Sequence, residues 1–429
     1  MTGSGVRRRP LLLAAAAASS LAACGSGLGS DQARLRVLQA SSAYASLDLF
    51  VDGIQRLSGI AFGSASGYVS VEDGTRTIAF ASSGSTTFLQ SQDRALERAV
   101  DYTVVVYGAA GALRTAQLVD DDSRPGSDKA RVRVLNTASD AGTLDVYLTG
   151  SAENLDDATP IAAGLGVGAA SGATELARGG WRLRVTAAGD TTDLRLDIPT
   201  LTLGDRQIAT LVITPGGGGV LVNALMLDHG GTVAALNNPN ARVRAIAAVA
   251  GRPVINVTAG TTVLASGLEA PSIGDYVLVP AGLLPLTLQV AGTTVAAANL
   301  DATGGADITL LVHGEGAATA QVLTITDDNR PPATTGNAKL RLLHGVSGIG
   351  TTLTLKVDLR TLAPQVPYAS ASAYASLAAT TTARIEVTSP AFAEPIALPS
   401  PAELKSDAVY TVFVIGGPAD RDAALIQDR

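Results

Sequence analysis

The chain is poor in the residue types that build chemical sites. Its 429 residues include one cysteine, three histidines, one tryptophan and two methionines, and aromatic residues make up 4% of the total. The patterns H-x-x-x-H, C-x-x-C and H-E-x-x-H do not occur, which argues against a zinc site. The histidines, His229, His313 and His344, are far apart along the chain. We interpret them as surface or strand-end residues.

Positive charge and long apolar runs are also scarce. The net charge is −7, and an acidic surface argues against nucleic acid, whose phosphates require lysine and arginine. Beyond the first residues no stretch reads as a membrane span, since the closest, 208–227, is interrupted by Pro215 and four glycines. That glycine run, 216–219, lacks the lysine and the Ser/Thr of a phosphate loop, so we predict a hairpin loop.

A serine nucleophile is missing from the two segments that most resemble a nucleophile elbow. The pattern G-x-S-x-G needs a central serine, but Gly63–Gly67 and Gly168–Gly172 both have alanine there. We interpret both as turns. The sequence therefore predicts no catalytic residue, no enzyme activity and no cofactor.

The single cysteine ends the run Leu21-Ala22-Ala23-Cys24, downstream of Arg7-Arg8-Arg9 and of an apolar run from Leu11 to Ala18. This layout is typical of a secretory signal peptide. The small residues before Cys24 resemble the lipobox of bacterial lipoproteins, which implies that Cys24 is acylated and becomes the first mature residue. Gly25 then implies sorting to the outer membrane. The alternatives are a cleaved signal with a chance cysteine, and a transmembrane anchor, for which the run is short of about 20 residues.

The rest of the chain consists of four copies of one unit. Ala33-Arg34-Leu35-Arg36-Val37-Leu38 recurs from Ala130, from Ala241 and from Ala338, at spacings of 97, 111 and 97 residues. A second segment, Leu47–Gly53 in the first copy, also recurs. The third landmark is a single position, held by Tyr68, Tyr276, Tyr374 and, in the second copy, Ala173. Each copy closes on a run such as Tyr102-Thr103-Val104-Val105-Val106-Tyr107-Gly108. Repeats of this length are domain-sized.

These recurring segments are predicted to be β-strands, because they are short, rich in β-branched residues and bounded by turn residues. Apolar residues alternate, so that Leu47, Leu49 and Val51 share one face while Asp48 and Phe50 share the other. About seven such strands per unit predict an all-β chain of four tandem immunoglobulin-like β-sandwiches. A small barrel is the alternative.

Two finer predictions follow from spacing. Arg36 lies 12 residues before Asp48, as Arg133 does before Asp145, so each pair is expected to make a cross-strand contact if the first two strands are neighbours. Tyr102 and Tyr410 open the closing strands, and we expect their hydroxyls to bond a nearby backbone group, as in the tyrosine corner of sandwich domains.

Together these landmarks resemble a bacterial family of uncharacterised tandem repeats. Its units open with A-R-V-R-V-x-N-A-S, continue with V-D-V-Y-V-D-G and later show Y-T-V-V-V-x-G. Residues 130–139 and 144–150 match best at the start of a unit, and the third and fourth copies diverge more. The resemblance covers nearly the whole mature chain. It implies the fold and an exported or surface location, and it offers no catalytic residue.

Acidic clusters end two of the copies and are the most ambiguous feature. Calcium takes six to eight oxygen ligands from such side chains, but a solvated linker turn is the simpler interpretation. No full set of ligands can be assembled from the sequence. The candidate calcium ligands are Asp120, Asp121, Asp122, Asp327, Asp328 and Asn329.

The predicted organisation is a signal peptide, a tether and four units. The segments are the signal peptide at 1–23, the tether at 24–31, unit 1 at 32–126, unit 2 at 127–238, unit 3 at 239–335 and unit 4 at 336–429. We expect a lipid-anchored cell-envelope β-rod with a structural, adhesive or binding role, and the alternative is an envelope hydrolase with a site in an inter-domain groove. Expected partners are membrane lipid, through acylated Cys24, and an envelope protein or glycan. The oligomeric state stays open.

Overall fold

The computed structural model describes residues 32–120 and 123–429. The signal peptide, the tether, Cys24, Asp121 and Asp122 lie outside the described residues. Strands dominate the described chain, which also contains two short 3-10 turns. No described helix is long and apolar enough to cross a membrane. The prediction of an all-β chain is therefore confirmed. The unit boundaries stay a prediction, and the unit names serve below as labels.

The strands of each unit follow the recurring segments. Unit 1 contains β1 (Ala33–Gln39), β2 (Ser46–Val51), β3 (Ile54–Ala61), β4 (Val69–Val71), β5 (Gly74–Ser82), β6 (Phe88–Leu96), β7 (Asp101–Tyr107) and β8 (Arg114–Asp120). Unit 2 contains β9 (Lys129–Asn136), β10 (Leu144–Thr149), η1 (Leu155–Asp157), β11 (Ala162–Leu165), β12 (Thr174–Ala177), β13 (Gly179–Ala187), β14 (Asp190–Leu203), β15 (Ile208–Pro215), β16 (Val222–Asp228) and β17 (Val233–Leu236).

The second half of the chain repeats this order with shorter pieces. Unit 3 contains β18 (Asn240–Val249), β19 (Val254–Ala259), β20 (Thr262–Glu269), β21 (Ser272–Ile273), β22 (Val277–Pro280), β23 (Gly282–Leu284), β24 (Leu286–Val290), β25 (Thr293–Val295), β26 (Leu300–Ala302), β27 (Asp307–Gly314), η2 (Ala317–Thr319) and β28 (Gln321–Asp327). Unit 4 contains β29 (Asn337–Val346), β30 (Leu353–Val357), β31 (Arg360–Val366), β32 (Ser370–Ala371), β33 (Ala375–Ala378), β34 (Thr380–Ala383), β35 (Ile385–Thr388), β36 (Ile396–Ala397), β37 (Ala402–Leu404), β38 (Val409–Gly416) and β39 (Asp422–Gln427).

Each unit has two main sheets that enclose a hydrophobic cluster. In unit 1 the sheets have the orders β4-β1-β7-β8 and β3-β2-β5-β6. The opening strand pairs in parallel with the closing one, β1 with β7, and β9 with β15, β18 with β27 and β29 with β38 repeat this. The term immunoglobulin-like thus describes the two-layer architecture rather than the strand order, since the opening strand lies at the centre of its sheet.

The alternation of side chains along β2 is as predicted. Leu47, Leu49 and Val51 join the cluster between the two sheets of unit 1. Phe50 lies on the opposite face, where it packs with Ala79 and Ala81. A strand places successive side chains on opposite faces, so a one-residue slip would move Asp48 and Phe50 into the cluster between the two sheets and the leucines out of it.

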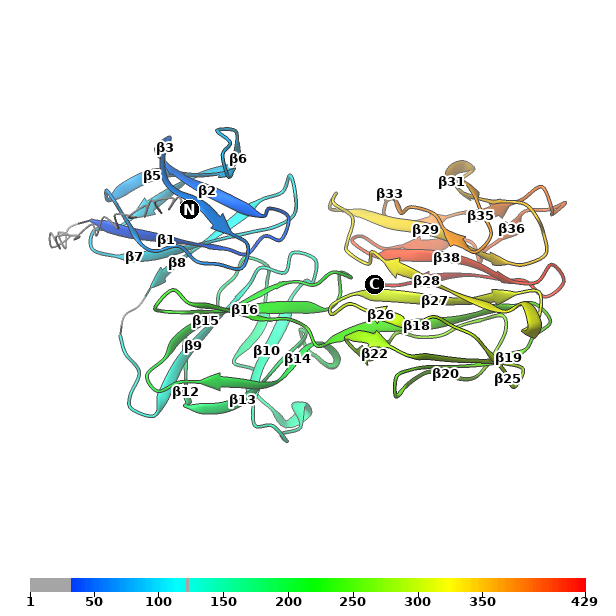
Figure 1. Ribbon diagram of the computed structural model, residues 1–429. Helices are drawn as coiled ribbons and strands as arrows, with labels where there is room; N and C mark the ends of the chain where they lie inside the picture. The colour runs from blue at the N-terminus through cyan, green and yellow to red at the C-terminus, as the bar shows by residue number, and fades with distance from the viewer. Residues whose placement is uncertain (1–31, 121–122) are drawn as a thin grey trace, which may run out of the picture.

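The units pack in pairs, sheet against sheet (Figure 1). Unit 1 lies on unit 2 through a buried cluster between their β1 and β9 sheets. Unit 3 lies on unit 4 through a second cluster between their β18 and β29 sheets. We call these two contacts the 1/2 seam and the 3/4 seam. The expectation of a rod must therefore be corrected, because sheets that bury apolar side chains on both faces pair laterally instead of lying end to end.

The glycine run 216–219 connects the two pairs. It is the predicted hairpin loop, between β15 and β16, and its tip contacts the 3/4 pair. The N–H of Gly218 donates to the carbonyl of Gly305 at 2.7 Å, and the N–H of Asn329 donates to the carbonyl of Gly218 at 2.9 Å. The side chain of Arg429 donates to the carbonyl of Gly219. A Cβ at Gly218 would lie 2.7 Å from Cγ of Asp307, so the close approach requires glycine.

The predicted contact between Arg36 and Asp48 is wrong. β1 and β2 belong to different sheets, so a spacing of 12 residues places the two side chains on opposite layers of the sandwich. Asp48 instead accepts from the N–H groups of Gly59 and Gly84, at 2.8 and 3.0 Å. Asp145 likewise accepts from the N–H groups of two glycines rather than from Arg133.

Both predicted tyrosine corners are confirmed. The hydroxyl of Tyr102 accepts from the N–H of Glu97 at 2.9 Å, and that of Tyr410 accepts from the N–H of Lys405 at the same distance. Each tyrosine is buried. The hydrogen bond satisfies a hydroxyl that burial would otherwise leave unpaired.

Candidate functional site

Every unit carries an arginine, a threonine and an aspartate at equivalent positions of the sheet that faces its partner unit. The arginine lies on the opening strand, and the threonine lies beside it on the closing strand. The aspartate ends, or directly follows, the strand that pairs with the closing strand on its other side. The arginine Nε donates to the threonine hydroxyl at 2.7 to 3.0 Å in all four units. The sets are Arg36, Thr103 and Asp120; Arg133, Thr210 and Asp228; Arg244, Thr309 and Asp327; and Arg341, Thr411 and Asp428.

At the 3/4 seam the sets exchange partners across the interface. Arg244 of unit 3 donates to Asp428 of unit 4 at 2.6 Å, and Arg341 of unit 4 donates to Asp327 of unit 3 at 2.5 Å. All four side chains are at most 3% exposed. Burial opposes the charge of Arg341, but the carboxylate of Asp327 raises the arginine pKa overall. Such pairs hold together only when each charge is matched.

A tyrosine completes this arrangement in three of the four units. It lies opposite the arginine on the neighbouring strand, and its ring packs against the guanidinium. The distances from the guanidinium carbon to the ring centre are 4.8 Å for Arg36 and Tyr68, 4.4 Å for Arg244 and Tyr276, and 4.6 Å for Arg341 and Tyr374. Cations attract the face of an aromatic ring at such distances.

The tyrosine hydroxyls add a hydrogen bond to the same carboxylates. Tyr68 donates to Asp120 at 2.6 Å, and Tyr276 donates to Asp327 at 2.7 Å. Burial, followed by the neighbouring carboxylate, raises the pKa of Tyr68 and of Tyr276 above the ordinary value. Both hydroxyls therefore stay protonated and act as donors.

The 1/2 seam has half of this reciprocal pairing. Arg133 of unit 2 donates to Asp120 of unit 1 at 2.7 Å. In the other direction, Arg36 donates to the backbone carbonyl of His229 at 2.8 Å instead of to Asp228. Asp228 accepts from Gln207 and from the N–H of Gly230, both at 3.0 Å, so it stabilises the turn that leads into β17. The additional hairpin of unit 2 thus withdraws one carboxylate from the seam.

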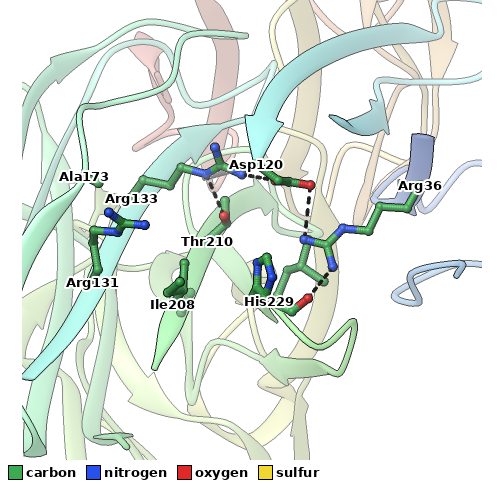
Figure 2. A pocket seen from close by; sticks show the side chains of 10 residues that line it. Arg36, Asp120, Arg131, Arg133, Ala173, Ile208, Thr210 and His229 are labelled. Carbon is green, nitrogen blue, oxygen red and sulfur yellow. Dashed lines mark hydrogen bonds and ion pairs between the residues drawn. The ribbon is translucent and has the colours of Figure 1, made fainter. Parts of the chain in front are cut away.

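A pocket lies at this incomplete position (Figure 2). Its volume is about 50 Å³, room for roughly four water molecules. Ala173 occupies the position that holds tyrosine in the other three units. In Figure 2, Arg131, Arg133 and Ala173 lie on one side of the pocket and Arg36 on the other, with Asp120, Thr210 and His229 between them. Apolar contacts come from Ile208, Ala209 and Leu227.

The chemistry of this pocket suits binding. Arginines supply charge and flat guanidinium surfaces, and one carboxylate supplies an acceptor. The hydroxyl of Thr210 already accepts from the Nε of Arg133 at 2.8 Å. We take the pocket of the 1/2 seam as the candidate functional site.

The candidate calcium ligands that the structure describes are hydrogen-bonded or ion-paired to other side chains and do not surround an open position for a cation. Asp120 and Asp327 accept from arginine, tyrosine and threonine in the seams. Asp328 pairs with Arg330 and Lys339, and Asn329 donates to Asp307 at 2.8 Å. Within residues 32–120 and 123–429, no group of three or more His, Cys, Asp or Glu side chains could hold a metal ion.

His229 directly follows β16 and His313 lies at the end of β27. His344 is buried inside β29, so the interpretation as a surface or strand-end residue is wrong for this histidine. The backbone of His229 contacts Arg36. His313 and His344 both lie beside Tyr368, with ring centres 5.2 and 5.8 Å from the tyrosine ring. Burial lowers the pKa of both histidines. The segments 63–67 and 168–172 form the predicted turns before β4 and β12.

Sequence reasoning noticed the tyrosines and Ala173 but missed the network around them. A signal was available, because the threonine precedes the aspartate by 17 or 18 residues in all four units. A polar triplet that recurs at constant spacing on apolar strands indicates a shared contact. Its partner could not be read from the repeat, since the contact joins two different units.

Comparisons with known proteins give a family and little more. A family model described as Domain of unknown function (DUF4397) matches residues 33–147 and 241–351, together more than half of the chain. No curated protein matches the sequence. Among solved structures, the Bacillus anthracis TIE protein is similar at 10% identity, over 90% of this chain and 68% of that chain, with a TM-score of 0.13.

Proposed function

The chain belongs to the DUF4397 family of domains of unknown function, and from that premise we propose that it is an exported, lipid-anchored binding protein of the cell envelope. Four repeated units form the rigid body that the anchor holds at the membrane. The protein binds its ligand in the pocket of the 1/2 seam.

The observation that carries the binding role is the difference between the two seams. The 3/4 seam is closed by two reciprocal ion pairs and two tyrosines. The 1/2 seam uses the same strands and the same arginines but leaves a pocket at Ala173. Because a closed version of the same contact exists in the same chain, the opening is not imposed by the fold. It arises from Ala173 and from the additional strand β17 of unit 2, and local changes of this kind are how binding sites are added to scaffolds.

The anchor rests on the sequence around Cys24. Leu21-Ala22-Ala23-Cys24 follows an apolar run and three arginines, and this layout favours export and acylation of the cysteine. One acyl chain gives marginal membrane binding, whereas several give stable anchoring. Gly25 favours the outer membrane as the destination.

Mass spectrometry of the mature N-terminus tests the anchor. We expect a terminal Cys24 that carries a diacylglyceryl group and an amide-linked acyl chain, in protein recovered with the membrane fraction. The variant Cys24→Ser should lose the acyl chains and be released from the membrane fraction. An unmodified mature terminus in the wild-type protein would refute the anchor and leave the pocket untouched.

A further inference from the structure

The position of Ala173 is defined by strand register. In unit 1, Val69 pairs with Leu35, so Tyr68 lies opposite Arg36. In unit 2, Thr174 pairs with Val132, so Ala173 lies opposite Arg133 in the same way. Units 3 and 4 repeat this register with tyrosine. Ala173 is therefore the structural equivalent of the three tyrosines.

The absent ring leaves the guanidinium of Arg133 more open than its counterparts. The side chain of Arg133 is 19% exposed, compared with 2 to 3% for Arg36, Arg244 and Arg341. Three of its five N–H groups donate, to Thr210, to the carbonyl of Val119 and to Asp120. In the other units a tyrosine ring covers the flat face of the guanidinium, and Ala173 provides no ring for this face of Arg133.

We propose that the pocket at Ala173 binds a phenolic ring, which packs on the face of Arg133 and donates its hydroxyl to Asp120. The ring packs on its arginine as Tyr68, Tyr276 and Tyr374 do. Its hydroxyl donates across the seam, whereas Tyr68 and Tyr276 donate to the aspartate of their own unit, because Asp228 is held by Gln207 and Gly230. Asp120 lines the pocket and already accepts a tyrosine hydroxyl from the unit 1 side. This inference deepens the binding role proposed above and rests on it.

The chemical class follows from three properties of the site. A flat cation selects a π-face over a saturated ring of the same size. A carboxylate acceptor selects a ligand with a hydroxyl donor over a carboxylic acid, which it would repel. The volume of about 50 Å³ is smaller than the roughly 150 Å³ cavity that encloses a benzene ring, so the pocket holds part of a single ring and the rest of the ring extends into solvent. The ring can come from a free phenol or from a tyrosine side chain of a partner protein.

A titration with p-cresol, followed by NMR of the arginine side chains, tests the proposal. The protein is the full chain with Cys24→Ser, labelled with ¹⁵N-arginine. The Nε–H of Arg133 donates to Thr210, which makes it suitable for detection. We expect a saturable shift of this signal with a dissociation constant on the order of a millimolar. 4-Methylcyclohexanol, which has the same size and hydroxyl but no π-face, should bind roughly tenfold more weakly.

Two matched variants locate the site. Ala173→Tyr fills the pocket from within and should abolish the saturable shift. Ala177→Tyr adds the same side chain four residues along the same edge strand, away from the pocket lining, and should leave binding unchanged. The fluorescence of Trp181 in β13 of unit 2, together with the far-UV circular dichroism spectrum, reports whether each variant is folded.

A second ligand distinguishes the source of the ring. Tighter binding of N-acetyl-tyrosinamide than of p-cresol assigns the site to a tyrosine on a partner protein, and the reverse order assigns it to a free phenol. The proposal is overturned if p-cresol produces no saturable shift, if the saturated analogue binds equally well, or if folded Ala173→Tyr still binds. Because the titration does not depend on acylation, its failure is distinguishable from failure of the lipid anchor.

Discussion

Replacing Asp327 with asparagine should destabilise the 3/4 pair strongly. Asp327 is 1% exposed and accepts from Arg341 at 2.5 Å, Thr309 at 2.6 Å and Tyr276 at 2.7 Å. Asparagine has one acceptor oxygen, so its amide group must face one of these donors. The change also leaves the buried charge of Arg341 without its partner.

The magnitude follows from the burial of that arginine. Removing one partner of a buried ion pair costs about 3–5 kcal/mol, because the remaining charge stays desolvated and unmatched. The chain offers a matched control at the equivalent position of unit 2. Asp228 accepts from Gln207 and Gly230 in a partly exposed turn, so Asp228→Asn should cost about 1 kcal/mol.

Unfolding in guanidinium chloride measures both variants with two probes. Trp181, the single tryptophan, lies in β13 of unit 2, so its fluorescence follows that unit, whereas far-UV circular dichroism follows the strands of all units. Asp327→Asn should lower the midpoint of a transition seen by circular dichroism and leave the fluorescence transition nearly unchanged. A loss below 1 kcal/mol, or an equal loss in Asp228→Asn, would show that the seam does not depend on this carboxylate.

Two further predictions concern the junction between the pairs. Gly218→Ala would place a Cβ 2.7 Å from Cγ of Asp307. We therefore expect the two pairs to separate and the radius of gyration from X-ray scattering to rise. In the control Gly217→Ala the new Cβ lies 3.9 Å from its nearest atom, the carbonyl oxygen of Gly305, and the radius of gyration should stay unchanged. Burial raises the pKa of Asp307 to about 6 from 3.8, so the folded state binds this proton more tightly and stability should fall as pH rises from about 4 to about 6. In calorimetric scans the stability of Asp307→Asn should depend less on pH over this window than that of the wild type. Part of the dependence should remain, because burial also raises the pKa of Asp140 to about 6. An unchanged pH profile of stability would contradict the assignment to Asp307.

The fold was predictable from the sequence because its determinants are local and repeated. The alternation in β2 separates Leu47 and Leu49 from Phe50, and the structure separates them in the same way. The tyrosine corners were equally accessible, since Tyr102 and Tyr410 lie five residues from their backbone partners. Short-range geometry of this kind depends little on how distant parts of the chain meet.

The candidate site was not predictable in the same way. Arg133 and Asp120 are 13 residues apart in sequence but belong to different units, and their contact exists only because two sheets pack face to face. The spacing of Arg36 and Asp48 suggested a neighbouring pair, but a turn between strands of one sheet and a crossover between two sheets can have the same length. Which of these forms depends on the packing of the whole sandwich.

The contrast between the two seams indicates how this chain divides its roles. Both seams use the same strands, arginines and threonines, so the cost of burying the guanidinium groups arises in both. At the 3/4 seam two aspartates and two tyrosines contact the guanidinium groups and offset part of that cost. At the 1/2 seam Asp228 turns away and Ala173 leaves Arg133 partly open. Proteins commonly give up some folding stability at the positions where they bind ligands. We therefore infer that the 3/4 pair acts mainly as a rigid support, and that the 1/2 pair carries the recognition surface.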